Sequence, residues 1–357
     1  MNDGKGSEAS GAGGTAGEPL PYLTADLPPI PGRLKERPED FVVEEIPAYL
    51  PSGEGEHLFL WIEKRDISVE FLKRHLSRTL DLSQRDIGMA GIKDRRAVTR
   101  QWISVPRRVE PDIGRIETED LRILEARPHG NKLRTSHLKG NRFSILLRTG
   151  NPPRDLATAA AVRERLLEQG LPNFFGEQRF GRQGETLADG LALLRGERRG
   201  RTPGWKRRFL LSAVQSWLFN QALGRHMRSK TLHRVLPGDV MQVVVSGGLF
   251  VAEEVDAEQE RFDRAEIVAT GPLFGPKMRS PEAKPAEVEA AILEAAGLSP
   301  AMFERHKKLV PGARRPYIVR LERLDVESAP EGLQFDMTLP AGTYATVVLR
   351  EFTKGAC

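Results

Sequence analysis

Runs of apolar, β-branched and aromatic residues predict strands in the first half of the chain. Residues 98–105 approach the alternation of a half-buried strand, whereas residues 87–92 are small and apolar enough for a buried one. The Pro-Glu-Asp turn at residues 38–40 precedes the first run. The predicted strands of this half are residues 41–46, 57–64, 87–92, 98–105 and 143–148.

Helical spacing of apolar residues follows the second strand. Val69, Leu72, Leu76 and Leu80 recur at this spacing, and Ser68 before them is a residue type that caps helix N-termini. Strands that alternate with helices indicate an α+β (mixed α/β) protein, a mixed sheet with helical cover.

The second half mixes helices and strands in the same way. Further helices are predicted over residues 155–168, 209–227 and 281–309, the last interrupted near Gly297. Residues 236–251 are interpreted as a loop and a hairpin, and from residue 316 the pattern is that of sheet through residue 352. The first seventeen residues are rich in Gly, Ala and Ser without apolar periodicity, which predicts a flexible tail; we draw that tail over residues 1–30.

Composition narrows the class of protein. The chain has 357 residues, 39% hydrophobic and 29% charged, with a formal net charge of +5, which permits nucleic-acid binding without demanding it. No apolar run is long enough to span a membrane and no signal sequence precedes the first strand, so we expect a cytoplasmic protein with no membrane partner. One cysteine, Cys357, and histidines without metal-ligand spacing predict no disulfide and no metal.

Candidate chemistry is concentrated in residues 88–105, GMAGIKDRRAVTRQWISV. Asp94 lies there between two predicted strands, and Lys93, Arg95 and Arg96 would favour its ionised, nucleophilic form. An aspartate among basic residues in a turn is more often a solvated surface pair, so the local pattern alone leaves that alternative open.

This stretch resembles the catalytic motif of the TruD family, tRNA pseudouridine synthase D, written G-x-K-D-[RK]-x-A-V-T-x-Q-W. Further blocks similar to the family follow the same order along the chain: RLKERPEDFVVEE, LKGNRF, LPNFFGEQRFG, SAVQSWLFN, TGPLFGPKM and LPAGTYATVVLRE. The resemblance covers nearly everything after the first thirty residues.

The resemblance implies roles for six residues. Asp94 would be the nucleophile, with Lys35 beside it, and whether it attacks carbon 1 of the ribose or carbon 6 of the uracil is open. A flipped uridine, expected at position 13 of tRNA, would be held by Phe41, Asn141, Phe143 and Tyr344. Tyr344 stands where relatives commonly have Phe. On local sequence alone, Phe41 is more readily explained by ordinary core packing. No cofactor is implied.

The resemblance also implies an architecture. A pseudouridine-synthase-type catalytic sheet domain would comprise residues 31–169 and 316–357, interrupted by a second, inserted α/β domain over residues 170–315. We expect a monomer.

Basic residues suggest where RNA would bind, although a charge run is usually a solvated loop. Aromatic residues surround Arg179, and residues 195–208 hold seven cations against one anion. Candidate phosphate contacts are Arg95, Arg179, Arg198, Arg199 and Arg201. The alternative function left open is a catalytically silent RNA-binding protein; a base methyltransferase is disfavoured because no Gly-rich loop follows an early strand.

Overall fold

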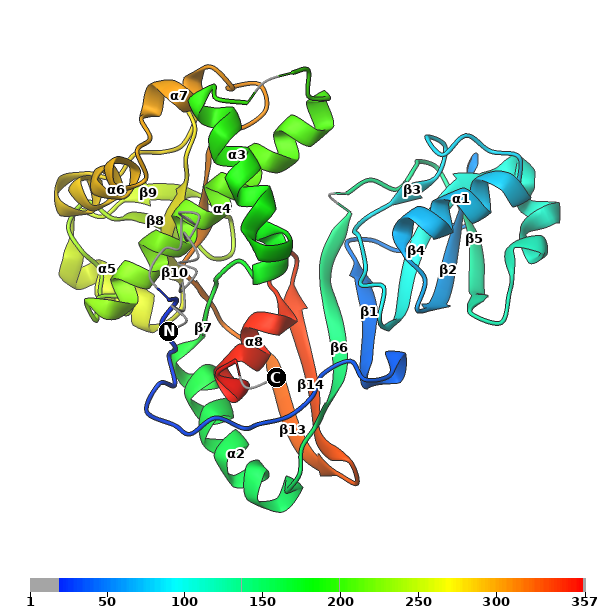
Figure 1. The fold of residues 1–357 in the computed structure, drawn as a ribbon, viewed down its shortest axis with the longest axis horizontal. Helices are drawn as coiled ribbons and strands as arrows, with labels where there is room; N and C mark the ends of the chain where they lie inside the picture. The colour runs from blue at the N-terminus through cyan, green and yellow to red at the C-terminus, as the bar shows by residue number, and fades with distance from the viewer. Residues whose placement is uncertain (1–18, 136, 199, 356–357) are drawn as a thin grey trace, which may run out of the picture. The chain divides into compact units, whose positions relative to one another are not determined.

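The computed structural model describes residues 19–135, 137–198 and 200–355. These residues form two compact units, which Figure 1 shows as ribbons. The sheet unit comprises residues 22–174 and 318–355, and the inserted unit comprises residues 19–21 and 175–317. The mixed α/β class predicted from the sequence is confirmed.

An eight-stranded mixed sheet is the centre of the sheet unit. Its order is β13-β14-β6-β1-β4-β2-β5, with β3 paired to β4. β1 and β4 run parallel, and the other neighbours are antiparallel. The strands are β1 Phe41–Pro47, β2 His57–Arg65, β3 Gly88–Met89, β4 Val98–Pro106, β5 Leu121–His129, β6 Leu138–Arg148, β13 Arg323–Ala329 and β14 Gly332–Pro340. A separate ladder joins β7 Leu171–Pro172 to β12 Ile318–Val319.

Three α-helices belong to this unit: α1 Val69–Thr79, α2 Pro152–Gln169 and α8 Ala345–Thr353. α1 begins as predicted, because the Ser68 side chain accepts a hydrogen bond from the Phe71 amide. Its Leu72 and Leu76 pack with the alternate residues Leu58 and Leu60 of β2. The 3₁₀ segments are η1 Pro38–Asp40 and η2 Arg107–Ile116.

The paired residues of neighbouring strands trace one face of the sheet from the strand that packs on α1 to the strand that packs on α8. Lys64 on β2 pairs with Thr99 on β4, which pairs with Val43 on β1. Val43 pairs with Phe143 on β6, and the same face reaches Phe335 on β14, which contacts a ring of α8. Paired residues of neighbouring strands point to the same face. Helices therefore cover both ends of this face, and β1 and β6 lie between them.

The inserted unit is built around a long helix, α4 Gly204–Arg228, whose buried residues include Leu211, Val214 and Leu218. Its sheet has the order β11-β10-β8-β9. The remaining elements are η3 Glu177–Phe180, η4 Arg182–Gly184, α3 Glu185–Arg195, β8 Val240–Val243, β9 Leu249–Val251, α5 Val255–Asp263, β10 Ile267–Leu273, α6 Ala283–Ala295, α7 Pro300–Glu304 and β11 Ala313–Pro316. The predicted hairpin and the interruption at Gly297 are confirmed.

The secondary structure predicted for the end of the chain is wrong. Residues 345–353 form α8 rather than a strand, although Val347 and Val348 favour sheet. The helix buries Val348, Leu349 and Phe352, and Phe352 packs edge-on against Phe335 of β14. Packing of this apolar face outweighs the local strand preference.

The predicted tail is too long. Thr24 is fully buried, and its backbone amide and hydroxyl donate to Oε2 of Glu351 at 3.0 and 2.8 Å. Ile30 is also buried, with its amide donating to the Phe352 carbonyl. Residues 24–30 therefore belong to the sheet unit. Residues 1–18 of the predicted tail lie outside the described residues.

Three further predictions about strands need correction. Residues 121–129, where no strand was predicted, form the edge strand β5, whose Pro128 is tolerated at the sheet edge. Only residues 88–89 of the expected strand 87–92 are paired, so Ala90 to Ala97 is a loop. β6 also begins earlier than predicted, at Leu138 rather than residue 143.

Candidate active site

The loop between β3 and β4 presents Asp94 to solvent beside Lys35. The Lys35 Nζ lies 2.9 Å from Oδ1 of Asp94, and the two side chains are 24% and 51% exposed. Lys35 has a φ of +57°, a left-handed conformation that is uncommon outside glycine. Such strain persists where surrounding structure fixes the backbone, and it often marks functional sites.

The same ammonium connects Asp94 to an aromatic pair. Lys35 Nζ lies 3.9 Å from the centroid of the Phe41 ring, within cation–π range. Phe41 meets Phe143 edge to face at 6.1 Å between centroids. The two rings are only 2% and 7% exposed, so both belong to the core, and Phe41 is linked to the carboxylate through Lys35.

A buried lysine holds the backbone of Asp94. Lys64, at 1% exposure, donates from Nζ to the carbonyl of Asp94 at 3.0 Å and to the carbonyl of Ile67 at 2.7 Å. Burial lowers the pKa of Lys64 to about 8, partly offset by the attraction of Asp94. Asp94 is therefore anchored through its main chain while its carboxylate remains accessible.

A second buried lysine fixes the preceding residue. Lys93 Nζ donates to Oε2 of Glu45 on β1 at 2.8 Å, with side-chain exposures of 4% and 0%. Burial raises the pKa of Glu45, and the Lys93 ammonium opposes this shift. This ion pair ties the loop to the sheet face that also carries Phe41.

The cations that the local sequence pattern placed beside the Asp94 carboxylate are wrong in part, whereas Lys35 is the residue that the family resemblance implied there. Lys93 points into the protein toward Glu45, and Arg95 lies 3.4 Å from Asp66. The cation that contacts the Asp94 carboxylate comes from residue 35, fifty-nine positions earlier. The charge is supplied by tertiary structure rather than by the neighbouring residues in sequence.

Asn141 lies on the same face as the aromatic pair. It pairs with Glu45 of β1 on one side and with Leu339 of β14 on the other. In the described part of the chain its Oδ1 is buried and accepts no hydrogen bond. Asn141 lies within β6, three residues after its start at Leu138.

Tyr344 is placed by the end of β14. Pro340 pairs with Gly140 of β6, the Ala341 amide donates to the Lys139 carbonyl, and the chain then turns through Gly342 at a φ of +86°. The Tyr344 backbone precedes α8, and its carbonyl accepts from the Val347 amide. Tyr344 therefore follows, by four residues, the end of β14, which is paired with the strand that contains Asn141.

Similarity to known proteins identifies the family. The family model described as tRNA pseudouridine synthase D (TruD) matches residues 19–202 and 202–352. The chain belongs to the TruD family. A protein of Thermus thermophilus named tRNA pseudouridine synthase D is 44% identical over 338 residues, covering 94% of this chain and 93% of that protein. One of Anaeromyxobacter dehalogenans with the same name is also 44% identical, covering 94% and 97%.

The fold agrees with a solved TruD structure. A crystal structure from Methanosarcina mazei that carries the TruD name superposes with a TM-score of 0.75 at 26% identity, covering 93% of this chain and 95% of that one. The two-part TruD architecture therefore extends to this chain over nearly all its length.

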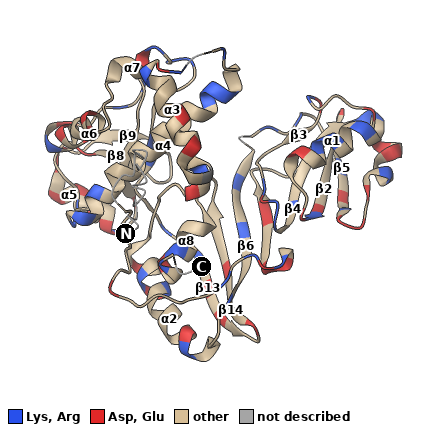
Figure 2. Cartoon of the chain, viewed as in Figure 1, with Lys and Arg blue, Asp and Glu red and all other residues tan. Residues whose placement is uncertain are grey.

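The candidate phosphate contacts differ in their surroundings. Arg179 donates to the hydroxyls of Ser216 and Ser212 on α4, at 3.2 and 2.8 Å. Arg198 is paired with Asp189 at 2.6 Å, whereas Arg201 is exposed. Arg199 lies outside the described residues. Figure 2 shows where Lys and Arg fall along the two units.

The sequence pattern did not indicate that Lys64 and Glu45 lie at the candidate site. Lys64 ends a predicted strand, where a lysine normally turns to solvent, and only the register that pairs it with buried Thr99 places it inside. Glu45 could have been suspected, because it shares the alternation of Phe41 and Val43. No group of three or more His, Cys, Asp or Glu among the described residues could hold a metal ion. None of the described helices is long and apolar enough to cross a membrane.

Proposed function

We propose that this chain isomerises uridine to pseudouridine in tRNA, with Asp94 as the nucleophile. The observation that carries the proposal is the state of Asp94: its carboxylate is half exposed, while Lys64 and the Lys93–Glu45 pair anchor its backbone. A nucleophile must be accessible and fixed in position. Membership of the TruD family supports tRNA as the substrate and position 13 as the target.

The reaction needs one carboxylate and no net change in atoms. An Asp94 oxygen attacks either carbon 1 of the ribose or carbon 6 of the uracil, and the N1–C1′ bond breaks with its electron pair going to N1. The detached uracil rotates and C5 bonds to C1′. C5 then releases its proton, N1 takes one up, and the Asp94 carboxylate is regenerated.

The neighbouring residues are assigned positioning roles. Lys35 would hold the attacking carboxylate through the 2.9 Å contact. The buried Oδ1 of Asn141, which accepts no hydrogen bond in the described part of the chain, suits the N3–H donor of uracil. Phe41, Phe143 and Tyr344 would enclose the base, which must leave its stack to reach Asp94.

We also propose a separate role for each of the two domains. The sheet unit contains all six proposed site residues and would be the catalytic domain. The inserted domain, expected over residues 170–315, would contribute RNA contacts through exposed cations such as Arg201.

Pseudouridine mapping tests the function directly. Transfer RNA from cells with and without this protein is mapped by a method that detects pseudouridine site by site. The proposal predicts loss of pseudouridine at tRNA position 13 when the protein is absent. Unchanged maps would favour the catalytically silent RNA-binding protein.

A further inference from the structure

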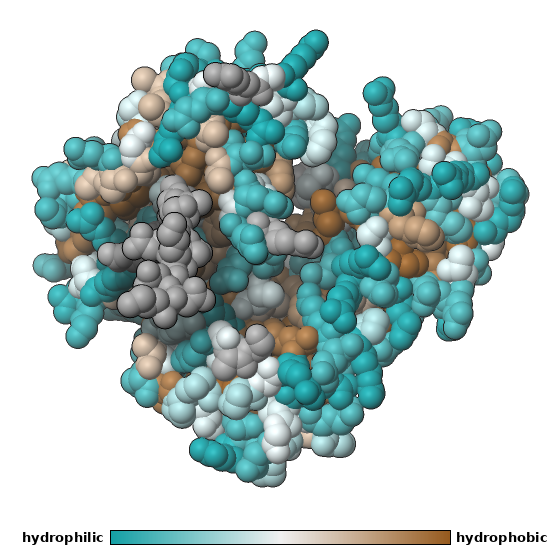
Figure 3. Space-filling model, in the orientation of Figure 1, coloured by the Kyte–Doolittle hydropathy of each residue, from teal (hydrophilic) through white to brown (hydrophobic). Residues whose placement is uncertain are grey.

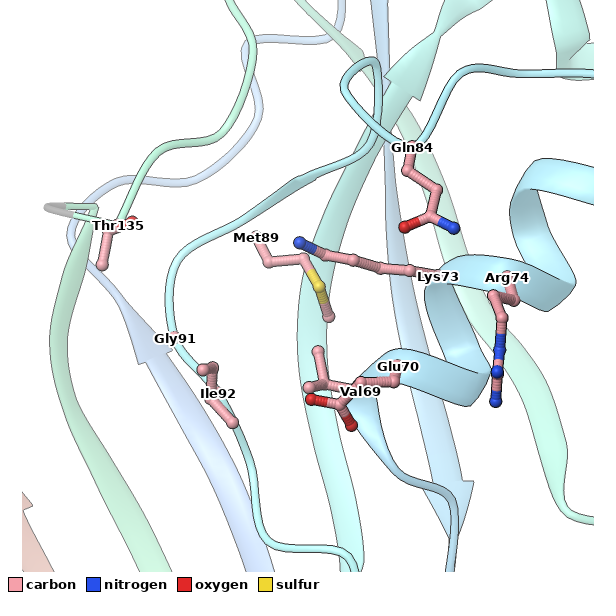
Figure 4. Close-up of a pocket in the computed structure, with 9 residues that line it drawn as sticks. All are labelled: Val69, Glu70, Lys73, Arg74, Gln84, Met89, Gly91, Ile92 and Thr135. Carbon is pink, nitrogen blue, oxygen red and sulfur yellow. The ribbon is translucent and has the colours of Figure 1, made fainter. Parts of the chain in front are cut away.

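A cleft of about 470 Å³ opens between α1 and the loop that carries Asp94 (Figure 4). One wall comes from Val69, Lys73 and neighbouring residues of α1, and the other from Gly91 and Ile92. Its volume lies within the range of about 300–1,000 Å³ typical of ligand pockets. Ile92 is two residues from Asp94, so the cleft lies within about 7 Å of backbone from the proposed nucleophile.

The cleft has an exposed apolar side. Ile92 is 81% exposed, the second highest exposure among the exposed large apolar residues of the described chain. In Figure 4 the side chains of Ile92, Val69 and Met89 lie around the middle of the cleft. Figure 3 shows apolar side chains surrounded by hydrophilic ones on the part of the surface that carries α1. Such a surface suits the face of a planar, uncharged group.

The same cleft has two cations available for a ligand. No ion pair or hydrogen bond of the Lys73 or Arg74 side chain is found among the described residues, whereas Arg65 and Arg100 of the same unit each pair with two carboxylates. Lys73 extends across the cleft above Met89 in Figure 4. An apolar surface beside unpaired cations matches a nucleobase and its phosphate.

We propose that this cleft binds an unpaired nucleotide of the RNA, next to the uridine that reacts at Asp94. The base would lie on Ile92, with Lys73 and Arg74 on the adjoining phosphates. Glu70 and Gln84, at the walls, offer acceptors and donors to the base edge. The inference rests on the proposed function, since it takes RNA as the substrate. A protein segment would use the apolar side without requiring the two unpaired cations.

The first test measures RNA binding of matched variants. Lys73→Ala/Arg74→Ala should weaken filter binding of a tRNA transcript and lower the slope of log K against log salt by about 1.4, for two single-strand phosphate contacts. Arg78→Ala on the same helix, outside the cleft, should change neither. Lys73→Arg should retain most of the affinity because it keeps the charge.

The second pair of variants tests the apolar side. Ile92→Ser should raise the Kd by about fivefold or more, because the apolar contact between this side chain and the base is lost. Leu124→Ser, on the edge strand β5, removes another exposed apolar side chain, at 48% exposure, and should leave the Kd unchanged. The proposal would be overturned if Lys73→Ala/Arg74→Ala and Ile92→Ser both kept the parental Kd and salt slope. It would also be overturned if the controls Arg78→Ala and Leu124→Ser lost as much affinity as the cleft variants.

A third measurement requires no variant that could fail to fold. Transcripts carry one 4-thiouridine beside the target uridine, on either side in turn, and are cross-linked to the parental protein. Cross-linked peptides should fall within residues 69–92, and none there would overturn the proposal. Absence of isomerisation by the parental protein would instead contradict the proposed function, while the binding data still decide the cleft.

Discussion

Lys35 Nζ lies 2.9 Å from Oδ1 of Asp94 and 3.9 Å from the centroid of the Phe41 ring. One ammonium therefore sets the direction of the carboxylate relative to the aromatic pair. An ion pair this exposed typically contributes about 0–1 kcal/mol to folding. We therefore expect the ion pair to matter for the orientation of the Asp94 carboxylate rather than for stability.

Replacing Lys35 should impair catalysis more than folding. Lys35→Ala removes the contact that orients Asp94, and a misplaced reacting group can cost about 100-fold in rate. We expect kcat to fall by about 10- to 100-fold with little change in melting temperature. Arg33→Ala, which removes an exposed cation paired with Glu36 in the same segment, is the control and should keep parental kcat. Equal kcat in both variants would remove Lys35 from the site.

Removing one partner of the Glu45–Lys93 ion pair should destabilise the protein more than removing both. Lys93→Met leaves the Glu45 carboxylate buried without its cation, and such losses cost about 3–5 kcal/mol. The double variant Glu45→Leu/Lys93→Met buries no charge and should be more stable than Lys93→Met alone. Urea unfolding of the parental protein and these variants measures both effects. A double variant less stable than Lys93→Met would show that the unpaired Glu45 carboxylate is not the cause of the loss of stability.

Lys64 should make stability depend on alkaline pH. Its pKa is about 8 in the folded protein and 10.5 when unperturbed. Between these values the unfolded chain holds a proton that the folded protein has released, so raising the pH favours folding. The free energy of unfolding of the parental protein, minus that of Lys64→Met, should rise above pH 8 by at most about 1.4 kcal/mol per pH unit. A difference that stays constant with pH would contradict the buried, shifted lysine.

Two arginines of the basic tract should behave differently. Arg201 is exposed, so Arg201→Ala should reduce the salt slope of tRNA binding by up to about 0.9 if it contacts a phosphate. Arg198 is paired with Asp189, and Arg198→Ala should have a smaller effect on that slope. Filter binding at several salt concentrations compares the two. A larger effect from Arg198 would mean that its ion pair opens when RNA binds.

The sequence predicted the elements with strong periodicity better than those set by packing. The α1 helix with its Ser68 cap follows local pattern, and the structure has it. The α8 helix could not be predicted this way, because Val347 and Val348 favour strands and only packing on β14 decides the outcome. The edge strand β5 was hidden by its Pro128 and its charged residues.

Asp94 could be selected from its motif, and the family resemblance implied Lys35 beside it, but the buried contacts around it could not be predicted. The local pattern suggested cations at residues 93, 95 and 96, whereas the carboxylate contact comes from Lys35 and the backbone anchor from Lys64. These contacts depend on the order β1-β4-β2, which brings distant segments together. The apolar and basic cleft beside Ile92 likewise appears only once α1 packs next to the loop.

The most direct test replaces Asp94, the proposed nucleophile. Asp94→Asn keeps the size of the side chain and removes the anionic oxygen, and Asp86→Asn changes a carboxylate before β3 as a control. Tritium release from carbon 5 of labelled uridine in tRNA is measured beside filter binding for both variants and the parental protein. We expect Asp94→Asn to bind tRNA but to release no tritium, and Asp86→Asn to match the parental protein. Release by Asp94→Asn at the parental rate would contradict the role of Asp94 as the nucleophile.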